Sequence, residues 1–188
     1  MESDIKILKL LLGNKEERIT IRKISKKLSI NYRIAYEKVV ALEKEGLITV
    51  IRAGNSKLCG FSDRFDYKVY EAEYKRRADL FKDKNFWVIQ NRLSELKFPF
   101  IVLLFGSYAK GTNVKHSDID ILTIGGDQKE IGKTLSLLPN KIHLTQVTYE
   151  EFIGMAKSKE FTAVSEAIKN NVILIGIEEY YRLLENAK

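Results

Sequence analysis

Apolar residues in the first sixty positions recur at helical spacing in three short segments, and two β-rich segments follow them. Thr20 and Ser29 are placed to cap the second and third helices, and Gly46 can close the third. The turn-forming residues between the two β-rich segments predict a hairpin. The predicted elements are helices over 4–13, 20–28 and 29–46 and strands over 47–52 and 57–61. This pattern predicts a compact unit over residues 1–62.

The rest of the chain alternates between helical and extended patterns. Residues 63–84 are dense in charge and tyrosine and lack Gly and Pro, which predicts a connecting helix. Apolar residues from Phe86 to Leu96 are spaced as in a buried helix, and residues 100–105 form a continuous apolar run typical of a strand covered on both faces. Further strands are predicted at 119–124, 142–148 and 172–175, and further helices at 129–138, 149–157, 160–170 and 178–185. We therefore expect an α+β fold, with a mixed sheet flanked by helices over residues 85–188.

Charge is distributed unevenly along the 188 residues, whose net charge is +7. Residues 1–60 hold 13 Lys and Arg against 7 Asp and Glu, and the remaining 128 residues hold 19 against 18. A basic part beside a near-neutral part is common where one part contacts nucleic acid, although Lys-rich surfaces also keep proteins in solution. The charge alone therefore leaves both interpretations open, a nucleic-acid partner and a surface that only keeps the protein in solution.

Cysteine usage and apolar runs bear on the cellular compartment. The single cysteine, Cys59, cannot form an intrachain disulfide, and no sequence partner suggests more than a structural role. No apolar run approaches the roughly 18 residues that a membrane span needs. The first residues lack a basic segment followed by an apolar one. We expect a cytoplasmic protein with no membrane partner.

The second and third predicted helices meet at residues 28–30, in a helix-turn-helix arrangement. In that geometry the second helix of the pair enters the major groove of DNA with its N-terminal residues forward. Arg33 could donate two hydrogen bonds to a guanine edge, and Asn31 could bind adenine. The other predicted DNA contacts are Ser29, Tyr32 and Lys38 from the helices and Arg52, Asn55 and Lys57 from the hairpin.

This stretch resembles the winged helix-turn-helix family of prokaryotic regulators. The resemblance is carried by Ile21-x-x-Ile24-Ser25-x-x-Leu28, by residues 36–45 and by Gly46-Leu47-Ile48. It implies double-stranded DNA as a partner and, because such regulators usually pair to read two half-sites, a homodimer. The alternative is a winged helix that only dimerises or binds protein.

A second group of residues carries candidate chemistry. A predicted buried strand runs into Gly106-Ser107, where a glycine allows backbone N–H groups to approach a phosphate and the serine hydroxyl adds a donor. Asp118 and Asp120 are two apart on a predicted strand, so both carboxylates point to the same face. Clustered carboxylates repel each other unless a cation lies between them, and oxygen ligands favour Mg²⁺ or Mn²⁺. The sequence predicts a metal-dependent phosphate site.

The pattern Gly106-Ser107, ten residues, then Asp118-Ile119-Asp120-Ile121 resembles the nucleotidyltransferase superfamily that includes DNA polymerase beta. The residues of this motif are most similar to those of the minimal nucleotidyltransferases of bacteria and archaea, and the resemblance covers roughly residues 85–148. The resemblance implies that Gly106 and Ser107 hold the phosphates of a nucleoside triphosphate, and that Asp118 and Asp120 bind the metal. Lys110 stands where such proteins often carry a basic residue, and it could contact phosphate or remain solvated.

One position departs from the family pattern. The family usually has a third acidic residue on a following strand, which serves the metal that activates the attacking hydroxyl, and His143 stands there. Neutral imidazole binds Mg²⁺ less well than carboxylate does. His143 is therefore a candidate catalytic base, a Mn²⁺ ligand or an ordinary strand histidine, and Glu150 or Glu151 could supply the acid if a loop folds back. Nucleotide binding is better supported than turnover.

Two hypotheses follow. In the first, the second domain transfers a nucleotidyl group from a nucleoside triphosphate to a hydroxyl of a protein, an RNA end or a small molecule, while the first brings the chain to DNA. The family resemblance also permits an antitoxin-like role beside a toxin partner. In the second, the chain is a non-catalytic transcriptional regulator that senses a nucleotide.

Overall fold

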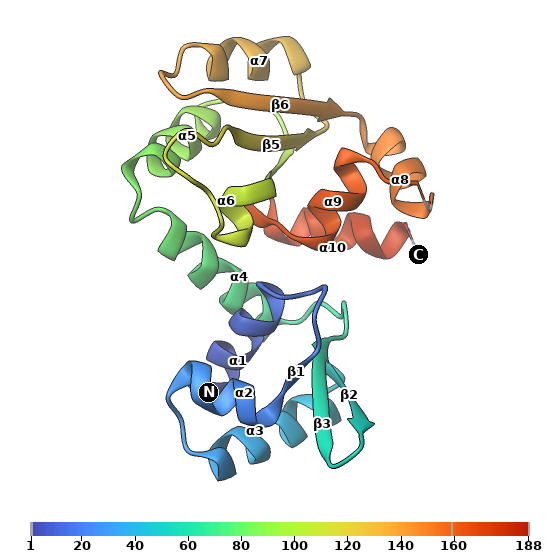
Figure 1. Cartoon of the computed structure of the whole chain (residues 1–188). Helices are drawn as coiled ribbons and strands as arrows, with labels where there is room; N and C mark the ends of the chain where they lie inside the picture. The colour runs from blue at the N-terminus through green and yellow to red at the C-terminus, as the bar shows by residue number, and fades with distance from the viewer. Residues whose placement is uncertain (1, 159, 188) are drawn as a thin grey trace. The chain divides into compact units, whose positions relative to one another are not determined.

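The computed structural model describes residues 2–158 and 160–187, and its chain divides into two compact units, Met1–Lys75 and Arg76–Lys188 (Figure 1). The division falls within helix α4 (Tyr67–Leu80). Both units combine helices with a sheet, so the predicted α+β class is confirmed. Within the described ranges, no helix has the length and apolar character needed to span a membrane.

The first unit consists of helices around a small antiparallel sheet. Its elements are α1 (Glu2–Leu12), β1 (Ile19–Thr20), α2 (Ile21–Leu28), α3 (Tyr32–Lys44), β2 (Ile48–Ala53), β3 (Ser56–Phe61) and the start of α4. The strand order is β1-β3-β2, with Val50 of β2 opposite Cys59 of β3. Cys59 is fully buried, and this burial raises the pKa of its thiol to about 11. The predicted helices and hairpin are present, whereas the two-residue β1 was not predicted.

The caps of α2 and α3 differ in part from the prediction. Thr20 caps α2, and its hydroxyl accepts a hydrogen bond from the Lys23 backbone N–H, as predicted. Ser29 does not cap α3, because it takes a left-handed conformation (φ 51°) that ends α2. Asn31 caps α3 instead, and its side chain accepts a hydrogen bond from the Arg33 backbone N–H. The left-handed residue makes a tight turn, which moves the start of α3 beyond Ser29.

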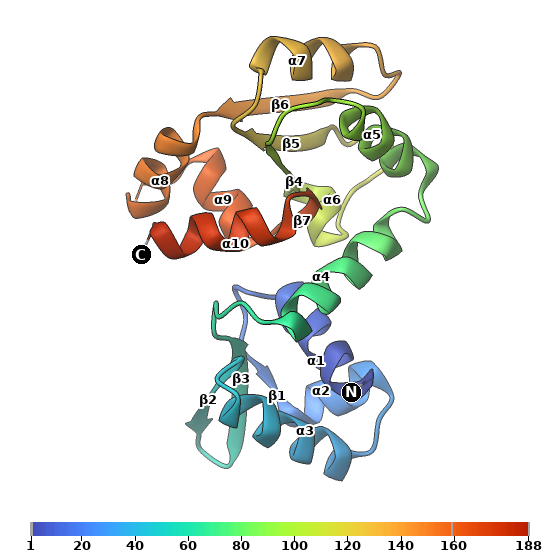
Figure 2. The same ribbon diagram turned by 180° about the vertical axis from the view of Figure 1, so that it is seen from behind.

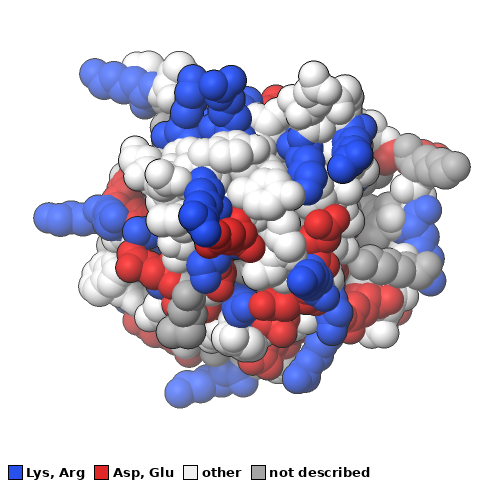
Figure 3. Space-filling view, turned by 90° about the horizontal axis from the view of Figure 1, so that it is seen from below, with Lys and Arg blue, Asp and Glu red and all other residues white. Residues whose placement is uncertain are grey.

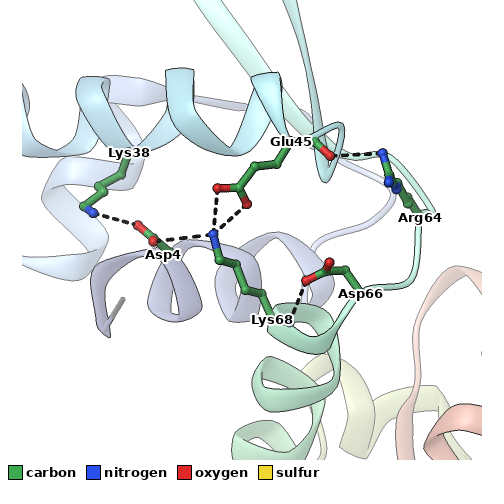
Figure 4. Close-up of polar contacts among 6 residues, drawn as sticks. All are labelled: Asp4, Lys38, Glu45, Arg64, Asp66 and Lys68. Atoms are coloured by element: carbon green, nitrogen blue, oxygen red, sulfur yellow. Dashed lines mark hydrogen bonds and ion pairs between the residues drawn. The ribbon is translucent and has the colours of Figure 1, made fainter.

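Ion pairs and hydrogen bonds among charged side chains connect the start of α4 with α1 and with the end of α3 (Figure 4). The Lys68 ammonium lies 2.7 and 2.6 Å from the two carboxylate oxygens of Glu45 and 3.9 Å from the nearly buried carboxylate of Asp4. Lys38 contacts the other oxygen of Asp4 at 3.2 Å, and the Arg64 guanidinium donates to the Glu45 backbone carbonyl at 3.1 Å. The hydrogen bond to Glu45 raises the pKa of Lys68 above its ordinary value.

Glu45→Gln is expected to lower the free energy of unfolding by about 1–2 kcal/mol, since a charge-assisted bond to a largely buried ammonium is lost while Glu45 itself stays partly solvated. Because the pKa of Lys68 is raised in the folded chain, this stabilisation is complete below about pH 10.4 and is lost as pH rises through the folded value. Urea denaturation at pH 8 and at pH 11 tests this prediction. The control, Glu43→Gln, removes an exposed carboxylate from the same helix. Equal losses in the two variants, or a loss that is no smaller at pH 11 than at pH 8, would contradict it.

The second unit is built on a mixed sheet with strand order β6-β5-β4-β7. Its elements after α4 are α5 (Lys84–Ser94), β4 (Ile101–Phe105), α6 (Gly106–Lys110), β5 (Ile119–Ile124), α7 (Gln128–Ser136), β6 (Ile142–Val147), α8 (Tyr149–Lys157), α9 (Ala163–Lys169), β7 (Val172–Ile175) and α10 (Ile177–Asn186). Strands β5 and β6 are parallel, and β4 is antiparallel to both of its neighbours. The prediction of a mixed sheet flanked by helices is confirmed.

Helices cover both faces of this sheet. Helices α5 and α7 pack on one face, where Phe86 and Ile89 of α5 and Ile131 of α7 join apolar side chains of the strands in one buried cluster. Helices α8, α9 and α10 lie on the other face (Figure 2). Strand β4 is buried along its whole length, which agrees with the continuous apolar run in its sequence.

Candidate functional site

Strand pairing in the second unit brings the two predicted metal-binding aspartates to the place where β4 ends and α6 begins. Asp120 of β5 lies opposite Phe105 of β4 on one side and opposite His143 of β6 on the other. Asp118 lies immediately before β5, two residues from Asp120. Both carboxylates are partly exposed, with 38% of the Asp118 side chain and 25% of the Asp120 side chain accessible. We refer to Asp118 and Asp120 as the acid pair.

Gly106 is directly beside this pair. Its φ is +67°, which favours glycine, and a Cβ at this position would lie 2.2 Å from Oδ2 of Asp120. No side chain fits there without moving the carboxylate. Ser107 follows as a half-buried residue in the first turn of α6. The structure thus brings Gly106, Ser107 and Asp120 together.

The segment after Gly106 forms the short helix α6. Gly111 ends this helix in a left-handed conformation (φ +68°), so the chain turns back here. The Lys110 ammonium lies 3.1 Å from a carboxylate oxygen of Glu166 on α9, and both side chains are about one-third exposed. Lys110 is therefore engaged with a carboxylate, and Glu166 is a neighbour of the site that the sequence did not indicate.

His143 of β6 and Lys141, immediately before β6, contact the acid pair. Nδ1 of His143 lies 3.2 Å from Oδ1 of Asp120, and the Lys141 ammonium lies 2.9 Å from Oδ2 of Asp118. Both side chains are well exposed, at 70% for His143 and 84% for Lys141. His143 was identified from the sequence, whereas Lys141 was missed. Its position two residues before His143, on the same face of an extended segment, is the signal that could have indicated it.

The glutamates considered as substitutes for a third acid lie at the start of α8. Glu151 forms a capping box there: its carboxylate accepts a hydrogen bond from the Thr148 backbone N–H at 2.7 Å, and the Thr148 hydroxyl accepts one from the Glu151 backbone N–H at 3.1 Å. Glu150 is exposed on the same turn. Across residues 2–158 and 160–187, no group of three or more His, Cys, Asp or Glu side chains is arranged to hold a metal ion.

The donors at the acid pair nevertheless fit a divalent cation. Carboxylate oxygens are hard ligands of the kind that Mg²⁺ and Mn²⁺ prefer, and the absence of a side chain at Gly106 lets the Asp120 carboxylate lie against the backbone where α6 begins. Mg²⁺ commonly takes only one or two carboxylates from a protein and completes its shell with water and substrate phosphates. Asp118 and Asp120 are therefore the residues that could hold such an ion.

The predicted DNA-contacting residues lie on the first unit, and several of them surround the start of α3. The Arg33 side chain is 87% exposed, and its Nε donates to Glu37 at 2.9 Å. Tyr32 is 53% exposed, and Asn31 and Ser29 beside it are also exposed. The side-chain oxygen of Asn31 already accepts the capping hydrogen bond of α3.

A groove of about 570 Å³ lies between α2, the start of α3 and the hairpin turn. Arg22, Lys26 and Lys57 line it together with Tyr32 and Tyr36, and none of the described lining residues is acidic. The Lys57 ammonium donates to the Tyr36 hydroxyl at 3.0 Å and lies 4.6 Å from the centre of that ring. Figure 3 shows lysine and arginine side chains projecting from much of this end of the first unit, with uncharged and acidic residues among them.

The remaining predicted DNA contacts fall in two places. Arg52 and Asn55 are exposed on the hairpin, close to Lys57. Lys38 is farther along α3 and is paired with Asp4 of α1, on the side of α3 that packs against that helix. The structure therefore groups the hairpin residues with the start of α3, and it separates Lys38 from them.

Comparisons with known proteins give a family match within the second unit and one curated relative. Residues 89–175 match the family model described as nucleotidyltransferase domain, and this segment contains Gly106, the acid pair and His143. A curated protein of Methanocaldococcus jannaschii, named "Putative protein adenylyltransferase", is 37% identical over 79 residues, which cover 42% of this chain and 57% of the relative. No solved structure gives a significant match.

Proposed function

We propose that this chain, which carries a nucleotidyltransferase domain at residues 89–175, transfers a nucleotidyl group from a nucleoside triphosphate to a hydroxyl acceptor with Mg²⁺ or Mn²⁺. The observation that carries the proposal is the acid pair beside Gly106, a position where any other side chain would displace Asp120. A partly exposed carboxylate pair held against the glycine backbone where α6 begins suits a cation bound together with a triphosphate.

The residues of the site have distinct roles in this proposal. Asp118 and Asp120 would hold the cation, which when bound neutralises triphosphate oxygens and orients an in-line attack. The Ser107 hydroxyl and the backbone N–H groups that follow Gly106 would donate hydrogen bonds to the triphosphate. In the reaction, the acceptor oxygen forms a bond to the α-phosphorus, the bond to the bridging oxygen of pyrophosphate breaks, and the hydroxyl proton is released.

The name of the Methanocaldococcus jannaschii relative favours ATP as the donor and a protein hydroxyl as the acceptor. We extend both substrates to this chain as part of the proposal. The half-exposed acid pair is compatible with an acceptor as large as a protein, because its carboxylates are reached from solvent.

Pyrophosphate release from each nucleoside triphosphate, with Mg²⁺ and with Mn²⁺, tests the proposal. The full chain is incubated with candidate acceptor proteins and compared with an Asp118→Asn/Asp120→Asn variant, and nucleotide binding is titrated in parallel. We expect release, and transfer of label from α-labelled ATP to protein, in the wild type alone. Nucleotide binding that depends on the aspartates, without pyrophosphate release, would favour a nucleotide-sensing regulator. This alternative is a specific one because His143 stands where the family usually has a third acidic residue. Absence of nucleotide binding would contradict both.

We further propose that the first unit is a winged helix-turn-helix domain that binds double-stranded DNA as a homodimer. The supporting observation is the groove between α2, α3 and the hairpin, whose charged lining residues are all basic. In such a complex the start of α3, with Arg33, would enter the major groove, while Lys57 and Arg52 of the hairpin would contact the phosphate backbone.

Lys57→Ala is expected to weaken DNA binding mainly through the loss of one phosphate contact. The slope of log affinity against log salt concentration should therefore become shallower by about one unit. Fluorescence anisotropy with a labelled duplex, between 50 and 200 mM salt, measures this slope. The matched control is Lys133→Ala, which removes a lysine from α7 in the other unit. Equal slopes for wild type and Lys57→Ala would contradict the proposed contact, and absence of wild-type binding would contradict the DNA-binding function.

A further inference from the structure

The two side chains that contact the acid pair, Lys141 immediately before β6 and His143 of β6, are basic or neutral. A second metal ion at this place would need anionic ligands. The backbone N–H of Ile119 donates to the carbonyl of Lys141 at 2.9 Å, and Asp120 pairs in register with His143. These backbone contacts fix Lys141 beside Asp118 and His143 beside Asp120, whatever rotamers their exposed side chains adopt. The departure from the family pattern, His143 in place of a third acidic residue, therefore changes the ligands available beside the acid pair.

Charge and ligand type both oppose a second divalent cation there. Two metal ions that share a phosphoryl-transfer site lie roughly 3.5–4 Å apart, so they need bridging and flanking anionic ligands. Here the Lys141 ammonium lies 2.9 Å from Oδ2 of Asp118, and a dication placed next to it would be repelled. The imidazole of His143 is a softer, uncharged ligand that binds Mg²⁺ poorly. Glu151 lies in the capping box of α8, beyond the opposite end of β6 from His143, and Glu166, which is nearer to the site, is already paired with Lys110 at 3.1 Å.

We infer that the acid pair holds a single divalent cation together with the nucleotide, and that Lys141 supplies the second positive charge that another metal ion would otherwise provide. This inference rests on the proposed nucleotidyl transfer. The Lys141 side chain is 84% exposed and is free to leave Asp118 for a triphosphate oxygen when a nucleotide enters. Removal of the positive charge at position 141 and introduction of a carboxylate at position 143 should therefore create a second metal position.

Counting bound Mn²⁺ tests the inference without requiring turnover. The full chain is saturated with a methylene analogue of ATP that cannot release pyrophosphate, or with the matching analogue of another nucleotide if that one binds. Free Mn²⁺ is then followed by electron paramagnetic resonance. We expect about one Mn²⁺ per bound nucleotide for the wild type and about two for Lys141→Met/His143→Asp. The matched control, Lys141→Met/His143→Asn, changes the same two exposed positions without adding a carboxylate and should bind about one.

The outcomes separate the inference from the function on which it rests. Two Mn²⁺ ions per nucleotide in the wild type would overturn the inference alone. A single ion in Lys141→Met/His143→Asp would also overturn it, because the side chains at positions 141 and 143 would then not decide the number of ions. If none of the analogues binds the wild type, the proposed function fails and the inference fails with it. Circular dichroism of each variant confirms that these exposed substitutions leave the fold intact.

Discussion

Gly106→Ala is expected to reduce nucleotidyl transfer by about 100-fold or more, because a misplacement of about 1 Å at a reacting centre has an effect of this size. The added Cβ would lie 2.2 Å from Oδ2 of Asp120, so the carboxylate must move away from its place in the acid pair. The left-handed backbone at Gly106 adds a strain of about 1–2 kcal/mol, a small part of the stability of a folded domain, so the unit should remain folded. Pyrophosphate release and Mn²⁺ affinity, measured on the same preparation, should both fall.

Gly111→Ala is the matched control for this effect. Gly111 has nearly the same φ, +68° against +67°, yet a Cβ there would meet no atom within 4 Å. The two variants therefore share the backbone strain and differ in the contact with Asp120. If Gly111→Ala loses as much activity as Gly106→Ala, strain in α6 rather than displacement of Asp120 is the cause. If neither loses activity, Asp120 does not have the proposed role.

Leu104→Ala is expected to lower the free energy of unfolding of the second unit by about 2–5 kcal/mol. Leu104 is completely buried in β4, between β5 and β7, and belongs to the cluster that packs against α5 and α7. Removal of its side chain leaves a cavity that the surrounding strands cannot close, because β4 is paired on both edges. Urea denaturation followed by circular dichroism measures the loss.

Leu137→Ala removes the same atoms from a position of the same unit that is 78% exposed. Its free energy of unfolding should lie within about 0.5 kcal/mol of the wild-type value. A comparable loss in both variants would show that burial in β4 is not the source of the Leu104 effect.

Most elements of the fold could be predicted because their apolar patterns are long enough to have a period. The run from Phe100 to Phe105 and the helical spacing after Phe86 are examples, and both correspond to buried elements. The pattern gives no sign of β1, since a strand of two residues has no period. The sequence also predicted the α3 cap at Ser29. The left-handed turn that moves this cap to Asn31 depends on backbone geometry, which the residue pattern does not reveal. The strand order arises from pairing between distant segments.

In the candidate site, too, features that depend on nearby residues could be predicted, whereas most contacts between distant segments could not. Gly106, Ser107 and the acid pair lie in a short segment whose spacing is visible in the sequence, and the strand register places His143 opposite Asp120. The contacts of Lys110 with Glu166 and of Lys141 with Asp118 join residues that are distant along the chain. The pair of Lys110 with Glu166 follows from tertiary packing and has no local signal, whereas Lys141 could have been indicated by its spacing of two residues from His143.

The burial of Cys59 has a practical consequence for spectroscopy. Its thiol is fully buried and its pKa is raised to about 11, so almost no thiolate exists at neutral pH and thiol-specific dyes should leave it unmodified. A cysteine introduced in place of Val114, which is 70% exposed in the segment between Gly111 and the acid pair, would then be the preferred labelling position. A fluorophore attached there could report the arrival of a nucleotide in real time, with Cys59 left in place.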